Sequence, residues 1–339
     1  MIPDRDAHPI FDMHCDLLVY LASVKGAHPA NKEDIGCAIP HLQEGNVKLQ
    51  VLAIYTSTEK GSADLARKQA EIFRQLLRDE NQFFTPLAGP KQLHGALGSK
   101  KTGILAAIEN VSGLCEEDEP LEQTFTRLEQ ILQKTERLLY LSLTHHGENR
   151  FGGGNSSKSG LKDDGKVLMD YLDGRRIAVD LSHTSTTLAH DILDYIDRKG
   201  LNIPVIASHS NFRAVYDHDR NLSDEIATEI IRRKGLIGMN FLRNFLHPDD
   251  PKMLTQHIQH GFEMGAKDAL CFGADFFCWK YHPDKSRIPF FFKEHEHAGK
   301  YQEILRQLNG ILNGEEQKAL AFRNVTNFIQ RNLYDLQRT

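Results

Sequence analysis

A histidine and an aspartate stand two residues apart at the end of a short apolar stretch, residues 10–16. Side chains alternate along a strand, so His14 and Asp16 face one side and Cys15 faces the other. An imidazole and a carboxylate placed in this way can bind one divalent cation such as zinc. An isolated pair of this kind is more often a buried histidine hydrogen-bonded to a carboxylate. The pair alone leaves both interpretations open.

Further ionisable residues follow other apolar runs of the chain. They are Glu109, the pair His145 and His146, His183, His209 and Asp275. Each of them alone is most simply a hydrogen-bonded residue of the core or its edge. All of them directly follow an apolar run. Whether they come together in the folded protein therefore depends on how these runs are arranged in space.

Eight apolar runs rich in β-branched residues alternate with charged, amphipathic segments. The runs cover residues 10–15, 47–55, 103–108, 138–144, 176–182, 203–208, 235–241 and 269–274. Helical spacing of apolar residues predicts helices within 63–78, 121–137, 186–198, 223–234, 254–264, 302–312 and 315–332. Such alternation is typical of βα units, and eight of them in this length predict a (β/α)8 barrel of the TIM type.

We expect one domain, residues 1–339, closed by the last two helices, because neither a linker nor a repeat is evident. In such a barrel the carboxyl ends of all strands meet at one face, where active sites lie. The ionisable residues should gather there, where crowding them without a metal would be costly. The polar, glycine-rich stretch 147–160 reads as a long loop over the same face.

Three histidines and three carboxylates exceed the three protein ligands of a single catalytic zinc. Two metals bridged by one carboxylate fit this number, and such a centre can hold a hydroxide nucleophile while it polarises a carbonyl or phosphoryl oxygen. Asp275 ends the last strand, apart in sequence from the other groups. A carboxylate there can carry a proton from the attacking water to the leaving group.

Composition narrows the class of partner. The net charge is −5 and the basic residues are scattered, which argues against nucleic acid and anionic membranes. No stretch is long and apolar enough to cross a bilayer, and the charged residues 1–6 are not followed by a signal region. Five widely spaced cysteines without a C-x-x-C pair do not suggest a disulfide framework. We expect a soluble, cytoplasmic protein.

Several motifs together resemble the membrane (renal-type) dipeptidases, the M19 metallopeptidases, which are related in fold to the amidohydrolases. The motifs lie at residues 11–17 (Phe-Asp-Met-His-Cys-Asp-Leu), 143–145, 179–183, 204–210, 220–224 and 272–276. Their order and spacing carry the resemblance through most of the chain. It implies a zinc-dependent dipeptidase, tolerant of a D-residue at the C-terminal position of its substrate, and a homodimer.

The resemblance also implies a role for individual residues. His14 and Asp16 would bind one Zn²⁺, His183 and His209 a second, and Glu109 would bridge the two ions. His145 would contact the substrate and steady the tetrahedral intermediate, and Asp275 would transfer the proton. Arg220 would bind the free carboxylate of the substrate, for which the guanidinium fork is well suited. Without the resemblance, Arg220 would be read as an ordinary surface residue.

The chain departs from the family pattern near the predicted barrel mouth. Asn110 and Val111 follow Glu109, where the family usually has two glycines, and Phe277 and Cys278 stand where Asp-Gly is usual. The loop after His145 also lacks the usual tryptophan-containing sequence. We expect these changes to affect specificity more than chemistry. Two alternatives stay open: a metal hydrolase acting on another amide, a lactone or a phosphoester, and a catalytically inactive binding homologue.

Overall fold

The computed structural model describes residues 7–334; residues 1–6, on which we based part of the argument against a signal region, and 335–339 lie outside the described residues. The strands within 7–334 belong to one parallel sheet. They are β1 (Ile10–Cys15), β2 (Val47–Tyr55), β3 (Phe84–Pro86), β4 (Thr102–Glu109), β5 (Leu138–Ser142), β6 (Ala178–Asp180), β7 (Val205–Ile206), β8 (Ile237–Met239) and β9 (Leu270–Phe272).

Eight of these strands follow one another in the order β7-β6-β5-β4-β2-β1-β9-β8. The two ends of this path meet at a bridge between Ala207 and Ile237. There the Ala207 amide donates to the Leu236 carbonyl, and the Gly238 amide donates to the Ala207 carbonyl, each at 2.8 Å. The sheet is therefore a nearly closed parallel barrel, which confirms the predicted TIM-type fold class.

Two glycines allow the backbone to come close at this junction. A Cβ atom at Gly238 would lie 1.9 Å from the Ser208 carbonyl oxygen, and one at Gly273 would lie 2.0 Å from the same atom. Real Cβ atoms do not approach backbone oxygen so closely, so any side chain here would push the strands apart. Both glycines therefore help to place residue 208 and the residue that follows it.

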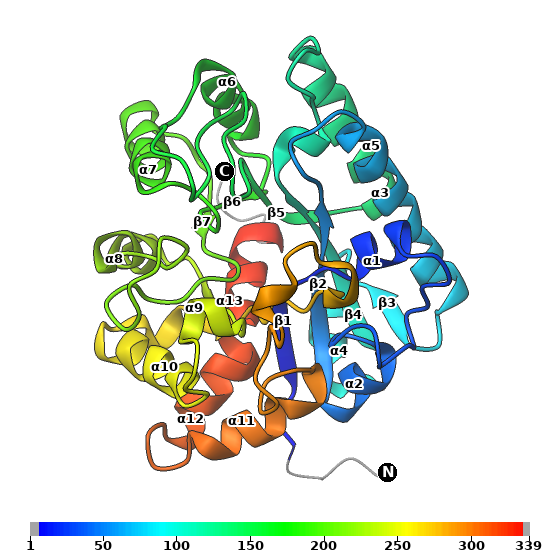
Figure 1. Ribbon diagram of the computed structural model, residues 1–339, viewed down its shortest axis with the longest axis vertical. Coiled ribbons are helices and arrows are strands. Elements are labelled where there is room, and N and C mark those ends of the chain that lie inside the picture. The colour runs from blue at the N-terminus through cyan, green and yellow to red at the C-terminus, as the bar shows by residue number, and fades with distance from the viewer. Residues whose placement is uncertain (1–6, 335–339) are drawn as a thin grey trace.

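Helices surround the barrel (Figure 1). They are α1 (Leu17–Ser23), α2 (Ile39–Glu44), α3 (Ser62–Asp79), α4 (Pro90–Gly98), α5 (Glu122–Thr135), α6 (Asp163–Leu172), α7 (Thr186–Lys199), α8 (Asp224–Arg232), α9 (Arg243–Leu246), α10 (Met253–Glu263), α11 (Tyr301–Gln307), α12 (Gly314–Lys318) and α13 (Asn324–Ile329). Buried residues of α3 such as Ala66, Ala70 and Phe73 recur at helical spacing, as the sequence predicts. Ser223 caps α8 by accepting a hydrogen bond from the Ile226 amide.

Several predicted strands end earlier than expected. The run 176–182 yields only Ala178–Asp180, and the run 203–208 yields only Val205–Ile206. Beyond these strand ends, a side chain accepts hydrogen bonds from backbone amides: Asp180 Oδ1 accepts from the amides of Ser182 and Ser208. The additional strand β3 was not predicted, because three residues are too short to show a periodicity, and it pairs with β4 outside the barrel path.

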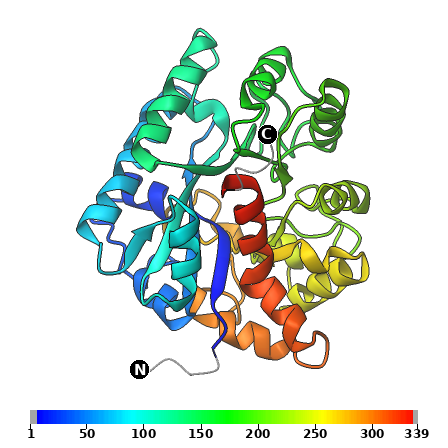
Figure 2. The ribbon, with the colours of Figure 1, turned by 180° about the vertical axis from the view of Figure 1, so that it is seen from behind.

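Two apolar cores flank the strands. The outer core lies between strands and helices, whereas the inner one fills the barrel with residues such as Phe11, Leu49 and Leu105. Val325, Phe328 and Ile329 of α13, together with Leu333, belong to the inner core. The predicted helix 315–332 is divided into α12, α13 and two π-helical segments, Ala319–Arg323 and Gln330–Tyr334. Figure 2 shows this red segment lying against the strands.

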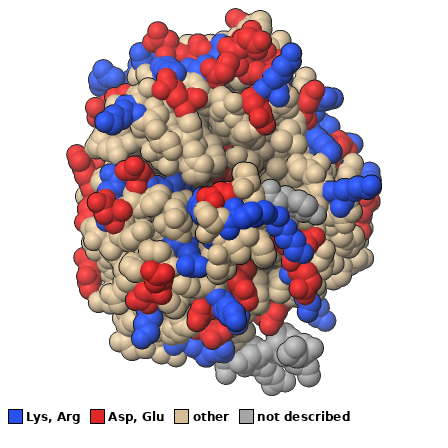
Figure 3. All heavy atoms as spheres, viewed as in Figure 1, with Lys and Arg blue, Asp and Glu red and all other residues tan. Residues whose placement is uncertain are grey.

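Charged side chains of both signs are scattered over the face drawn in Figure 3. Within residues 7–334, no helix has both the length and the apolar character that crossing a membrane requires.

Candidate active site

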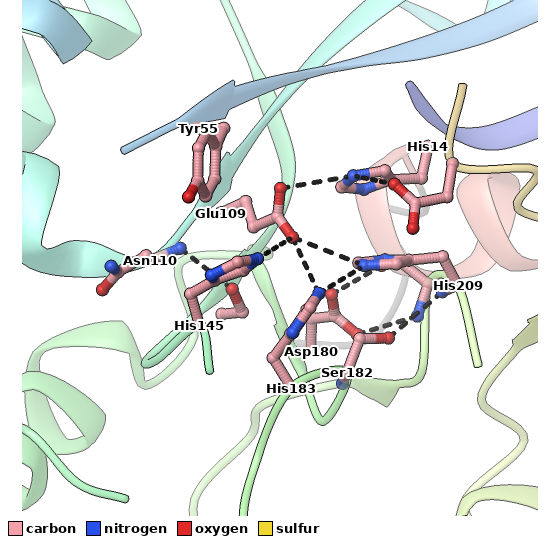
Figure 4. Close-up of polar contacts among 12 residues, drawn as sticks. His14, Tyr55, Glu109, Asn110, His145, Asp180, Ser182, His183 and His209 are labelled. Atoms are coloured by element: carbon pink, nitrogen blue, oxygen red, sulfur yellow. Dashed lines mark hydrogen bonds and ion pairs between the residues drawn. The ribbon is translucent and has the colours of Figure 1, made fainter. Parts of the chain in front are cut away.

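The strand-end residues predicted from the sequence converge on the Glu109 carboxylate, which ends β4 and is almost completely buried (Figure 4). Glu109 Oε2 lies 3.3 Å from His14 Nε2. Glu109 Oε1 lies 3.1 Å from His183 Nε2 and 3.4 Å from His209 Nε2. The two oxygens of one carboxylate therefore face different groups of imidazoles. His14, Asp16 and Glu109 form one potential cation site, and Glu109, His183 and His209 form another.

An irregularity in β1 turns His14 toward this centre. Asp12 pairs with Gln50 of β2 and Cys15 pairs with Leu52, so three steps of β1 match two steps of β2. Such a bulge re-aims one side chain. Cys15 belongs to the outer core, as the alternation predicted, whereas His14 points into the barrel.

The Asp12 carboxylate fixes this bulge. Its Oδ1 accepts hydrogen bonds from the amides of His14 and Ala274, and its Oδ2 accepts one from the Tyr301 hydroxyl. Asp12 thus holds the strand that carries His14 and does not face the centre.

Hydrogen bonds determine which nitrogen of His14 carries its proton in the neutral ring. The Tyr140 hydroxyl donates to the Met13 carbonyl oxygen at 2.9 Å, so it accepts from His14 Nδ1 at 2.7 Å. The proton therefore lies on Nδ1, and the lone pair of Nε2 points at Glu109. Nothing in the described residues donates to this buried Nε2 atom.

His209 and His183 are oriented in the same manner. Ser208 Oγ donates to Asp180 Oδ2 at 2.6 Å, so it accepts from His209 Nδ1, also at 2.6 Å. His183 Nδ1 donates to Asn155 Oδ1 at 3.3 Å. Both Nε2 lone pairs then face the centre, where the two atoms are only 3.1 Å apart. Each ring has the outer hydrogen bond that is usual for histidines that bind a metal.

This arrangement fits bound cations. In their neutral forms the three imidazoles direct Nε2 lone pairs at two carboxylate oxygens, and buried Asp16 Oδ1 also lacks a donor among the described residues. Acceptors at such distances repel unless a proton or a metal lies between them. Burial would lower the pKa of His14, but the Glu109 carboxylate outweighs this effect and raises it to about 10. The pocket therefore attracts positive charge, and its nitrogen and oxygen donors suit zinc-like ions.

His145 and Asp275 flank the centre without the same close contacts. His145 Nε2 lies 3.9 Å from Glu109 Oε1, and its ring packs against the rings of His183 and Tyr55. Burial lowers the pKa of His145 to about 3, so the ring is neutral at pH 7. Asp275 Oδ1 lies 3.7 Å from His14 Nε2, and its Oδ2 accepts from the Asn240 amide group at 2.8 Å.

Three residues at the site have left-handed backbone conformations. His183 has φ +65°, Asp275 has φ +64° and Asn110 has φ +73°. Side-chain-bearing residues seldom adopt such values, and asparagine tolerates them best. This explains how Asn110 can stand where the family usually has glycine. Its amide group donates to the Thr56 carbonyl oxygen at 2.9 Å, which anchors the turn after Glu109.

Arg220 lies behind His209 and is almost fully buried. Its guanidinium donates to Ser210 Oγ at 2.7 Å and to the His209 carbonyl oxygen at 2.8 Å. Arg220 is absent from the residues that line the pocket, although its Nε atom has no hydrogen-bond partner among the described residues. Arg220 thus lies near the centre, but two of its N–H donors are already used in hydrogen bonds within the protein.

A pocket of about 150 Å³ opens over the centre, and several of its residues were not singled out from the sequence. These are Tyr55, Leu242, Phe245, His282, Arg287 and Phe290. Tyr55 is the last residue of β2, so its position at the end of an apolar run could have marked it in the sequence. His282 and Arg287 lie between β9 and α11, in a segment of loops and short 3-10 helices such as Lys285–Arg287, where no sequence pattern marks them. Phe277 lines the pocket, whereas Asn110, Val111 and Cys278 do not.

Comparison with known proteins gives a family and a fold. The model of the membrane dipeptidase family, peptidase family M19, matches residues 5–331. Two uncharacterized dipeptidases of Schizosaccharomyces pombe are each 30% identical to this chain, over 129 and 148 residues. These matches cover 36% and 40% of this chain but only 30% and 34% of the relatives.

Solved structures share the fold at low sequence identity. The M19 metallopeptidase called dipeptidase AC superposes with a TM-score of 0.80 at 18% identity, covering 96% of this chain and 99% of that one. A metallopeptidase from Rhodobacter sphaeroides, liganded with a phosphinate mimic of L-Ala-D-Ala, gives 0.79 at 18% identity, covering 96% and 100%. The match of the family model along nearly the whole chain shows that this protein belongs to the membrane dipeptidase family, peptidase family M19.

Proposed function

We propose that this protein is a dinuclear zinc dipeptidase. In this proposal His14 and Asp16 hold one ion, His183 and His209 hold the other, and Glu109 bridges them. One observation carries it: the Nε2 lone pairs of three imidazoles converge on both oxygens of a single buried carboxylate. Family membership supports the same reading.

When bound, two such ions would lower the pKa of a water molecule and polarise the carbonyl oxygen of a peptide bond. The protein must then move a proton and hold the substrate. Asp275 is proposed to carry the proton, because its carboxyl group borders the centre and burial raises its pKa to about 6, which favours exchange of a proton near neutral pH. Its Oδ2 is held by Asn240, which leaves Oδ1 facing the centre.

His145 is suited to stabilise negative charge on the substrate oxygen. The ring is neutral and partly exposed to the pocket, so an N–H group can donate to the oxygen as its charge develops. Packing against His183 and Tyr55 restricts the rotation of the ring. A donor fixed in this way needs little reorganisation during the reaction.

Arg220 is proposed to attract the free carboxylate of the dipeptide. Burial lowers the pKa of Arg220, but guanidinium stays charged at pH 7. Because two of its donors are committed and the residue does not line the pocket, it would act on the substrate carboxylate through its positive charge. We include D-residues at the C-terminal position, because the Rhodobacter sphaeroides relative was solved with a mimic of L-Ala-D-Ala.

The test is hydrolysis of a panel of L,L and L,D dipeptides by zinc-loaded protein, followed by chromatography of the released amino acids. We expect cleavage of at least one class, and N-acetylated or C-amidated forms should be resistant. Failure on every member by protein with its metals bound would overturn the proposal. Arg220→Ala separates this function from hydrolysis of another amide, a lactone or a phosphoester when it is compared with wild type at equal metal content, because Arg220 also donates to the His209 carbonyl oxygen. At equal metal content, only a carboxylate-bearing substrate should lose its cleavage.

A further inference from the structure

A second group of imidazoles and a carboxylate lies apart from the candidate active site. His41 and Glu44 belong to α2, and His297 precedes the short helix Ala298–Lys300 that leads into α11. Their ligand atoms lie within 4.8 Å of one another. Figures 1 and 2 show α2 and the orange segment before α11 side by side at the same end of the molecule.

Glycines allow these two segments to meet. A Cβ atom at Gly45 would lie 2.0 Å from the Ala298 carbonyl oxygen, so a side chain there would separate α2 from the segment of His297. A Cβ atom at Gly299 would lie 2.6 Å from Glu44 Oε2 and 2.9 Å from His297 Nδ1. The missing side chain of Gly299 thus leaves a space bordered by two potential ligand atoms.

His41 presents a lone pair to this space. Its Nε2 lies 3.2 Å from the Lys32 carbonyl oxygen, which can only accept, so Nε2 carries the proton in the neutral ring. The lone pair is then on Nδ1, which is buried and has no hydrogen-bond partner among the described residues. It faces Glu44 Oε2 at 3.8 Å, too far for a hydrogen bond. The His41 ring thus donates one N–H to a backbone carbonyl and directs its other nitrogen at the space beside Gly299. This is the usual arrangement of a histidine that binds a metal.

His297 supplies a second imidazole. Its ring stacks on that of His41 with centroids 3.9 Å apart, and burial lowers its pKa to about 4. A neutral ring is the form that binds metal. In the absence of a ligand, His297 Nδ1 accepts a hydrogen bond from the Gly299 amide at 3.2 Å, and coordination through this atom would replace that bond. A cavity of about 360 Å³, lined by both histidines, gives access from solvent.

We propose that His41, Glu44 and His297 form a peripheral site for a divalent transition-metal ion of the zinc class. Two imidazole nitrogens and one carboxylate oxygen are a common ligand set for zinc, and water can complete the tetrahedron. Such an ion would join α2 to the segment before α11, which are about 250 residues apart in sequence. The site shares no residue with the candidate active site. The ion would therefore stabilise the contact between these two segments and take no part in the reaction.

The experiment is zinc binding by equilibrium dialysis and elemental analysis, on protein already loaded at the active site. Wild-type protein should bind about one more zinc per chain than His297→Gln, and Glu44→Gln should weaken that zinc by at least about tenfold. Gly299→Ala should weaken it without removing a ligand, because the new methyl group displaces Glu44. His94→Gln, at an exposed histidine of α4, is the matched control and should bind like wild type.

The substitution Glu109→Gln tells the two sites apart, because it should reduce the metal content of the active site and leave the peripheral zinc in place. Dipeptide cleavage should be unchanged in His297→Gln. The proposal is overturned if wild type binds no more zinc than His297→Gln, or if the zinc lost in that variant is also lost in His94→Gln. Glu44 is exposed, and His297 and Gly299 are partly exposed, so the variants at these three positions should fold.

Discussion

The floor and the rim of the pocket differ in how their polar atoms are fixed. By the floor we mean the residues around Glu109, which are His14, Asp16, Glu109, His183, His209 and Asp275; His14 and His209 lie beneath the pocket and do not line it. By the rim we mean Phe277, His282, Arg287 and Phe290. In the floor, each histidine Nδ1 has a hydrogen bond that sets the direction of the ring. In the rim, Arg287 Nε has no hydrogen-bond partner among the described residues, and Phe277 and His282 pack edge-on or tilted against Phe290.

This difference separates two tasks. Strand ends joined to neighbouring strands hold ligand atoms to fractions of an ångström, which metal chemistry requires. The rim lies outside the sheet, in loops and short 3-10 helices. Such segments tolerate substitution and can adapt to a new substrate. Among the departures from the family pattern, Phe277 faces the pocket from the rim, whereas Asn110 and Val111 directly follow Glu109 of the floor and do not line the pocket.

Glu109→Gln should have the largest effect on the floor. An amide offers one acceptor oxygen and a donor NH₂ group in place of two acceptors, so both proposed metal positions weaken. We expect activity to fall by at least about a thousandfold, with loss of metal, because the group acts on both ions. Elemental analysis and dipeptide cleavage measure this; Glu122→Gln at the surface of α5 is the control. An active, fully loaded variant would contradict the bridge.

Asp180→Asn tests a residue that supports the floor indirectly, through a hydrogen bond to Ser208. The carboxylate accepts from Ser208 Oγ, which in turn fixes His209. An amide can turn its NH₂ group toward Ser208 and release the ring, so we expect metal affinity to fall by about 10- to 100-fold. Competition with a fluorescent chelator would measure it. The same loss in Asp170→Asn, on the surface of α6, would show that the effect is unspecific.

Gly273→Ala should disturb the floor through the backbone alone. The added methyl group would lie 2.0 Å from the Ser208 carbonyl oxygen and displace the segment that carries His209. We expect a loss of about 1–3 kcal/mol in the free energy of unfolding, together with weaker metal binding. Chemical denaturation measures the first quantity. Gly147→Ala, where a Cβ meets nothing within 4 Å, should be close to neutral.

Arg287→Gln should affect the rim and leave the floor intact. Loss of this partly exposed charge should raise KM for dipeptides by about three- to tenfold, the factor that roughly 1 kcal/mol gives. The metal content and kcat should not change. Steady-state kinetics with Lys285→Gln as the control, on the same segment, would check this. A large fall in kcat would mean that the rim takes part in the chemistry.

The sequence predicted most of the floor, because strand-end positions and the barrel topology can be read from local patterns. His14 and Glu109 lie at the ends of β1 and β4, and His183 and His209 follow β6 and β7 by three residues, yet all four converge. The hydrogen-bond partners that orient them were not predicted. Tyr140 lies 126 residues from His14, and no local pattern marks such a pair. The bulge in β1 likewise depends on the register with β2, which alternation within one strand cannot reveal.

The rim escaped prediction for another reason. His282 and Arg287 lie in a stretch with neither helical nor strand periodicity, so their position depends on tertiary packing alone. Arg220 was singled out by family resemblance, but the sequence could not show that two of its donors are already used.

The contact of α13 with the inner core has a consequence for how the protein is made. Phe11 and Met13, near the start of the chain, share the inner core with Val325, Phe328 and Leu333. During synthesis the strands emerge long before these last residues, so the inner layer stays incomplete until the ribosome has passed beyond position 333. The apolar side chains of β1 that face the inner core therefore stay partly uncovered until the last helix has been made.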